Sequence, residues 1–284
     1  MSTFAGRNWF YDFVTLPSIF DGPNSKKVAD RLIERYSVLT KLWDVSKNTQ
    51  WTLRIYTAAK LIMSATLHVN SADYAQRHNL RAVVPYLKYY SLLSLLRAIC
   101  LTLPEQLWHE GRIIQMSHGA AIDGALGHIE KFNKQYAAIA RDDIKQYKAN
   151  RELLSYRAPS VGDSQIEDNA PFLCLCAALG EIAQFNSELL DLSITKNGDL
   201  STFILDKAIF KEIAGVEIDG HFYGDSEDAY RLDYLYRKHP RPSHILNLMS
   251  EGHVEEFFGA WCSQDDEAES FNPDDAKQII FEIP

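Results

Sequence analysis

A row of cations in the middle of the chain is the first candidate for chemistry. Its members are separated by seven, four, three and three residues: Lys134, Arg141, Lys145, Lys148 and Arg151. On a helix these spacings place the side chains on one face, and a basic helical face is the electrostatic footprint of nucleic-acid binding. The sequence therefore predicts a nucleic-acid-binding stripe. A solvated helix face and a docking surface for the chain's own acidic half stay open as alternatives.

An arginine and a histidine with five residues between them, Arg112 and His118, form the second candidate. They follow a stretch at residues 86–98 that is rich in tyrosine and leucine. This pairing resembles the HEPN superfamily, helical-bundle domains in which a helix of this kind precedes a closely spaced arginine and histidine. The resemblance covers residues 50–157.

The resemblance implies metal-independent RNA cleavage, usually by a dimer in which two such elements face each other. His118 would then be the general base that takes a proton from a ribose 2′-hydroxyl, and Arg112 would stabilise the phosphate oxyanion. Many HEPN-like domains are instead inactive binding or scaffold modules. The alternative for this chain is that Arg112 is a surface cation and that His118 caps or lines the helix after it.

Arg97 is a cation close to an apolar helix face. On a helix it shares a stripe with Tyr90 and Ser94, beside a stripe of leucines. A cation in such a place must find a partner or extend to water. We expect an ion pair with a carboxylate such as Asp123 or Glu152, with a ligand phosphate as the alternative.

Three acidic or imidazole side chains alternate near the C-terminal end: Glu217, Asp219 and His221. On one side of a strand they would form a site for a hard metal ion, and hence a metal-dependent hydrolase. Asp219-Gly220 reads equally well as a hairpin turn. The sequence has no glycine-rich phosphate loop, nucleophile elbow or zinc-protease motif. We therefore expect neither a metal nor a cofactor.

The composition is that of a chain that buries a core, with 46% apolar and 12% aromatic residues. Its four cysteines are too few and too scattered for a disulfide framework, which fits a reduced, cytoplasmic setting. Cys174 and Cys176 are expected in the core. No apolar run has the length of a signal peptide or a membrane span, so we expect no membrane association.

Charge is distributed unevenly along the chain. Residues 1–160 carry 21 Lys or Arg against 13 Asp or Glu, whereas residues 161–284 carry 8 against 25. A segment rich in turn formers lies at this change of sign. The predicted organisation is a basic helical bundle over 1–157, a linker over 158–170, an acidic α+β portion over 171–263 and an acidic tail over 264–284.

Hydrophobic periodicity predicts a mainly α fold, an N-terminal helical bundle with a smaller acidic α+β C-terminal portion. Helices are expected over residues 25–45, 50–69, 80–101, 120–156, 171–192 and 243–261. Asn197-Gly198 and Asp219-Gly220 are hairpin signals, and residues 278–283 could add an edge strand.

The interpretation that best fits these features is a HEPN-like helical module that binds a protein or nucleic-acid partner without catalysis. The alternative is a metal-independent HEPN-like ribonuclease, acting as a homodimer and using Arg112 and His118. A metal-dependent hydrolase built on Glu217, Asp219 and His221 is a third reading.

Overall fold

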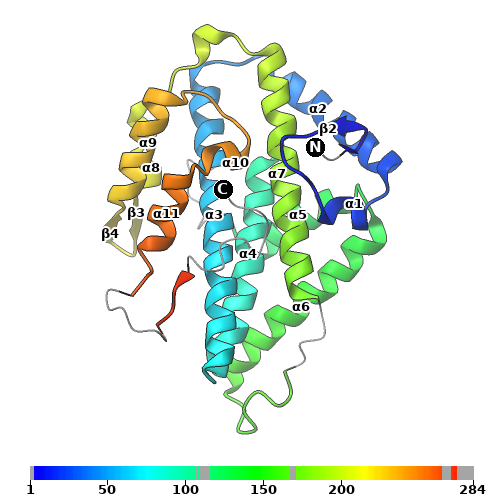
Figure 1. The fold of residues 1–284 in the computed structure, drawn as a ribbon, viewed down its shortest axis with the longest axis vertical. Coiled ribbons are helices and arrows are strands. Elements are labelled where there is room, and N and C mark those ends of the chain that lie inside the picture. Colours follow the sequence, from blue (N-terminus) through cyan, green and yellow to red (C-terminus); the bar gives the residue numbers. More distant parts are fainter. Residues whose placement is uncertain (1–2, 107, 109–115, 167–170, 264–269, 274–284) are drawn as a thin grey trace.

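The computed structural model describes the chain except residues 1–2, 107, 109–115, 167–170, 264–269 and 274–284 (Figure 1). The predicted edge strand over 278–283 and most of the predicted tail therefore lie outside the described residues. The fold is mainly helical, as predicted, with two two-stranded sheets in the described part. Within that part, no helix combines the length and apolarity needed to cross a membrane.

Long helices make up the bundle that dominates Figure 1. They are α2 (Gly22–Thr40), α3 (Val45–Arg77), α4 (Val84–Thr102), α5 (His118–Ile129), α6 (Lys134–Arg157) and α7 (Phe172–Asn197). The contact between α3 and α4 is the most extensive, and α7 packs against both α2 and α4. A one-turn 3₁₀ helix, Arg81–Val83, leads into α4.

Asparagine and aspartate side chains fix where several of these helices begin. Asp21 accepts the N–H of Asn24 at the start of α2, and Asn133 accepts the N–H of Tyr136 at 3.0 Å at the start of α6. The prediction of one continuous helix over residues 120–156 was wrong, because this cap begins a new helix after a connection of four residues.

Short elements flank the bundle at both ends of the chain. The N-terminal ones are β1 (Thr3–Phe4), β2 (Arg7–Asn8) and α1 (Thr15–Ile19). After α7 come the 3₁₀ helices Leu200–Thr202 and Lys207–Ile209, then α8 (Lys211–Ala214), β3 (Gly215–Ile218), β4 (His221–Gly224), α9 (Ser226–Lys238), α10 (Ile245–Leu248) and α11 (Glu251–Gly259). They form the small C-terminal α+β portion that the sequence predicts.

One of the two hairpin signals is confirmed. Asp219 and Gly220, with φ of +50° and +80°, form the turn between the antiparallel strands β3 and β4. At Asn197-Gly198 the hairpin prediction was wrong, because α7 continues to Asn197 and Gly198 is its C-cap. The expected helix over 243–261 consists of α10 and α11.

The hydrophobic core runs across the predicted linker at residues 158–170. A single cluster of buried side chains extends from Phe4 to Phe258 and includes both the bundle and the C-terminal portion. The described part of the linker connects α6 to α7, and α7 contributes buried residues along its whole length. The change of charge therefore falls at a connection within one shared core.

Two buried glutamates of α7 hold the N-terminal strap, defined as residues 3–19. Glu181 is 1% exposed and accepts main-chain hydrogen bonds from Val14, Thr15 and Leu16 at 2.9–3.3 Å. Glu188 accepts from the main chain of residues 10 and 11 at 2.8 and 3.0 Å. The first turn of α1 thus obtains from α7 the acceptor that its own sequence does not supply.

Glu181→Ala should lower the free energy of unfolding by about 2–4 kcal/mol, because three main-chain N–H groups lose their acceptor. Urea denaturation followed by circular dichroism measures the change. Glu34→Ala, at an exposed position of α2, is the matched control and should change it by less than about 0.5 kcal/mol. Equal small effects of both substitutions would show that Glu181 does not hold the strap.

Candidate anion-binding site

Helices α4, α5 and α6 bring together a cluster of aromatic, imidazole and cationic side chains, the candidate anion-binding site, for short the anion-binding site: Tyr89, Arg97, His118, Lys148 and Arg151. His118 is the first residue of α5, and Ser117 caps that helix by accepting the N–H of Ala120. The His118 ring is half-buried, and its Nδ1 lies 2.8 Å from the hydroxyl oxygen of Tyr89.

Arg97 is a half-buried cation without an ion-pair partner in the described part of the chain. Its Nη2 donates to the main-chain oxygen of Met116 at 2.9 Å, two residues before His118. Its Nε is buried and has no hydrogen-bond partner. The expected ion pair is not formed, because Asp123 pairs with Arg141 and Glu152 pairs with cations of α6.

Arg151 connects the cationic and the aromatic side chains of the site. Its guanidinium carbon lies 5.2 Å from the ring centroid of Tyr89 and 6.0 Å from that of Tyr156. One carboxylate, Glu152, approaches it at 3.2 Å. Its Nε, like that of Arg97, is buried without a partner, so two arginines of the site hold unused donors.

The surroundings of His118 keep its imidazole neutral. Burial lowers the pKa of His118 below its ordinary value, and the positive charges of Arg97, Arg151 and Lys148 lower it further, while Glu152 alone among these neighbours raises it. Burial likewise raises the pKa of the Tyr89 hydroxyl and lowers the pKa of Arg97. At neutral pH the site therefore combines three cations with one carboxylate and two neutral rings.

The hydrogen bond between Tyr89 and His118 can form with either tautomer of the imidazole, and the tautomer decides what the ring can do chemically. If the tyrosine hydroxyl donates to Nδ1, the other ring nitrogen, Nε2, carries the proton and can donate to an anion. If Nδ1 carries the proton, Nε2 is free to accept one and can serve as a general base. The positive charges of Arg97 and Arg151 favour any anion that approaches either form.

The structure brings only part of the predicted stripe to this site. Lys148 and Arg151 lie near His118, whereas Arg141 and Lys145 pair with aspartates at 2.6 and 3.7 Å. Lys134 is exposed at the start of α6. Lys148 and Arg151 also share a carboxylate, that of Glu152, at 3.7 and 3.2 Å. Their position at the α4–α5–α6 junction therefore distinguishes them from the rest of the stripe. Arg112 lies outside the described residues.

The three residues that the sequence offered as metal ligands lie on the exposed β3–β4 hairpin. Glu217 and His221 belong to opposite strands, and Asp219 occupies the turn between them. In the described ranges no group of three or more His, Cys, Asp or Glu side chains is placed to hold a metal ion.

The expectation that both helix cysteines are core residues was half wrong, since Cys176 is buried but Cys174 is exposed.

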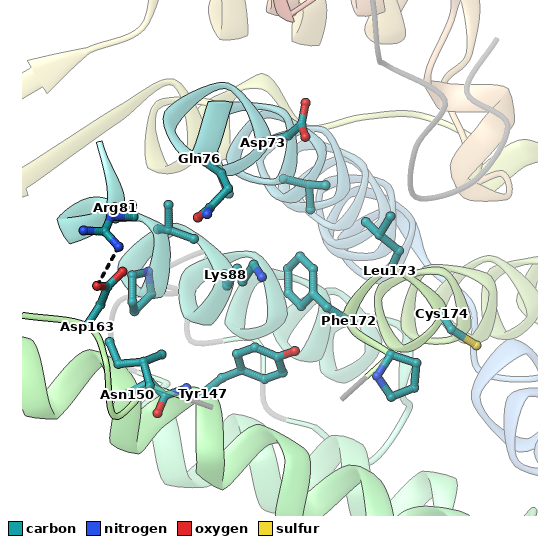
Figure 2. A pocket seen from close by; sticks show the side chains of 16 residues that line it. Asp73, Gln76, Arg81, Lys88, Tyr147, Asn150, Asp163, Phe172, Leu173 and Cys174 are labelled. Carbon is teal, nitrogen blue, oxygen red and sulfur yellow. Dashed lines mark ion pairs between the residues drawn. The ribbon is translucent and has the colours of Figure 1, made fainter. Parts of the chain in front are cut away.

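A separate cavity of about 870 Å³ lies between α3, α4, α6 and the start of α7. Figure 2 shows Lys88 and Tyr147 at its centre beside Phe172. An ion pair of 3.1 Å between Arg81 and Asp163 crosses one side of it. Its lining includes none of the five residues of the anion-binding site, so the two are distinct.

The role of Tyr89 is the feature of the site that the sequence did not reveal. The sequence has a tyrosine-rich stretch, but Tyr89 and His118 are 29 residues apart and belong to different helices. Only the packing of α5 on α4 brings the two side chains together.

Comparison of the chain with protein-family models, curated proteins and solved structures found no match.

Arg151→Gln should raise the pKa of His118 toward its ordinary value of 6.5, because one of the cations that disfavour the imidazolium is removed. Titration of the His118 ring by NMR measures this shift. Lys145→Gln is the matched control on the same helix and should leave the titration nearly unchanged. An unaltered pKa in Arg151→Gln would mean that the guanidinium does not act on the ring.

Proposed function

We propose that this chain is a HEPN-like helical module that binds the phosphate backbone of RNA through the anion-binding site. The observation that supports this most is Arg97, a half-buried cation without an ion-pair partner in the described residues and with a buried, unpartnered Nε. An uncompensated buried charge is costly. A phosphate would supply both the opposite charge and the acceptors that a guanidinium fits.

Exposed aromatic rings beside the charges favour a nucleic acid over a free phosphate ion. Tyr90 is 36% exposed and its ring centroid lies 6.1 Å from that of His118. Tyr156 is 74% exposed and lies next to the guanidinium of Arg151. Unpaired bases stack on rings of this kind while cations hold the backbone.

Arg97→Met should weaken RNA binding at least about ten-fold and reduce its dependence on salt concentration, because one phosphate contact is lost. Fluorescence anisotropy with a labelled, mixed-sequence, single-stranded RNA at several salt concentrations measures both. Lys145→Gln, a cation already paired with Asp142, is the control and should change affinity only slightly.

Two results would contradict the proposal. One is undiminished binding by Arg97→Met, with thermal unfolding used to confirm that the variant is folded. The other is equally effective competition by inorganic phosphate and by RNA at equal phosphate concentration, which would identify a small-anion site.

Metal-independent RNA cleavage is the second candidate, and the neutral imidazole of His118 favours it. A base that acts at neutral pH must be unprotonated there, and burial and the neighbouring cations keep the pKa of His118 low. In this reaction His118 would take the proton of a ribose 2′-hydroxyl, Arg112 would stabilise the phosphate oxyanion, and a homodimer would bring two sites together.

Cleavage of the same RNA with chelator present throughout tests this candidate. If it holds, the wild-type chain cleaves, and His118→Ala and Arg112→Ala lose activity but keep RNA affinity within about two-fold, since Arg97 supplies the phosphate contact. Binding without cleavage by the wild-type chain would leave the binding module and exclude the ribonuclease for the isolated protein.

A further inference from the structure

The largest cavity described lies between α3 and the β3–β4 hairpin, away from the anion-binding site. Its volume is about 1370 Å³, and α3 forms one wall while β3, Phe222 of β4 and residues at and after α11 form the other. Pockets for small molecules usually measure roughly 300–1,000 Å³. The cavity is therefore large enough for a segment of polypeptide.

The edge of strand β3 lines this cavity. All four of its residues, Gly215–Ile218, contact the cavity. Consecutive side chains of a strand point to opposite faces, so a cavity that touches four residues in a row runs along the edge of the strand. In Figure 1 the hairpin stands at the outer side of the C-terminal portion.

The hairpin register determines which main-chain groups this edge offers. In the tight turn at Asp219-Gly220, Ile218 and His221 form the hydrogen-bonded pair that closes the turn. The next pair, Glu217 and Phe222, is then a non-hydrogen-bonded pair. The N–H and C=O of Glu217 consequently point away from β4, and within the described residues they form no main-chain bond outside the sheet.

The hairpin side of the cavity has an apolar part beside the charged residues Lys211 and Glu217, and the α3 side is mixed. Val216, Ile218 and Phe222 are 43%, 38% and 74% exposed. Ser64 and His68 lie one helical turn apart on the opposite wall, and burial lowers the pKa of His68, so that its imidazole is neutral. These walls accept apolar side chains and uncharged hydrogen-bonding groups.

The positive charge of Lys211 in the cavity lining favours a ligand with a negatively charged group. Lys211 is exposed, lines the cavity next to β3, and has no ion pair in the part of the chain that the structure describes. Lys60, in contrast, is held by Asp225 and Asp228. An acidic side chain near Lys211 would therefore find a partner.

We propose that this cavity binds an extended peptide of a partner protein, apolar at alternate positions and with an acidic residue at one end, as a third strand on the edge of β3. Strand addition satisfies the outward N–H and C=O of Glu217, which a lipid chain would leave unpaired. Alternate side chains of the added strand then pack against Phe222 and the apolar residues of α3.

The test uses the full chain and a labelled synthetic peptide, Glu-Thr-Ile-Thr-Phe-Thr-Ile-Thr, followed by fluorescence anisotropy. Glu217→Pro removes the outward N–H, and proline is tolerated at strand edges where that N–H does not serve the ladder. Glu217→Thr removes the same charge but keeps the N–H, which makes it the matched control. We expect Glu217→Pro to bind at least about ten-fold more weakly, and Glu217→Thr to bind like the wild-type chain.

Each other outcome overturns the proposal. Equal binding by all three proteins would mean that the peptide does not pair with β3, and no binding by any of them would exclude this class of partner. If only a chain ending at Pro273 binds the peptide, the occupant is the chain's own C-terminal segment instead of a partner. Thermal unfolding of Glu217→Pro within about 3 °C of the wild-type chain verifies that the hairpin is intact.

Discussion

The structure depends on one requirement, that the buried polar side chains of α7 find hydrogen-bond partners. Glu181 and Glu188 obtain theirs from the N-terminal strap, and Gln184 and Ser187 from the main chain at the start of α10. Asn186 bonds to the last turns of α4 and α5. Each unmet group would cost about 1–3 kcal/mol in this core, so one helix fixes the position of four separate parts of the chain.

Two arginines inside the bundle differ in how many of their donors have partners. Arg54 is 2% exposed and donates to the main-chain oxygens of Leu101, Leu103 and Gln106 at 2.7–3.0 Å. Those carbonyls at and beyond the end of α4 accept from all three of its nitrogens, and the negative end of the helix dipole offsets its charge. Arg97 has one such bond and an unused, buried Nε. This difference in unused donors, more than charge itself, supports the proposal that Arg97 contacts a ligand whereas Arg54 serves the fold.

The sequence predicted the fold class and most helices, because apolar periodicity and caps are local signals. It did not separate α5 from α6, since Asn133 acts as a cap only where a tight connection buries its neighbour Phe132. Asp-Gly became a hairpin turn, whereas Asn-Gly at Gly198 ended a helix whose last turns are held by tertiary packing. At the site, the awkward position of Arg97 was visible in the sequence. The lack of a carboxylate partner for Arg97 and the hydrogen bond between His118 and Tyr89 were not visible there, because both depend on which helices pack together.

The strap of residues 3–19 has a consequence for the order in which the protein folds during synthesis. Its main-chain groups bond to glutamates that follow 165 to 178 residues later. At the usual 5–20 residues per second, a ribosome needs on the order of ten to thirty seconds to add that length. Over this interval Leu16 and the aromatic residues of the strap have no α7 to dock on. The strap is thus synthesised long before the helix that holds it, and its apolar side chains stay undocked until α7 has been added.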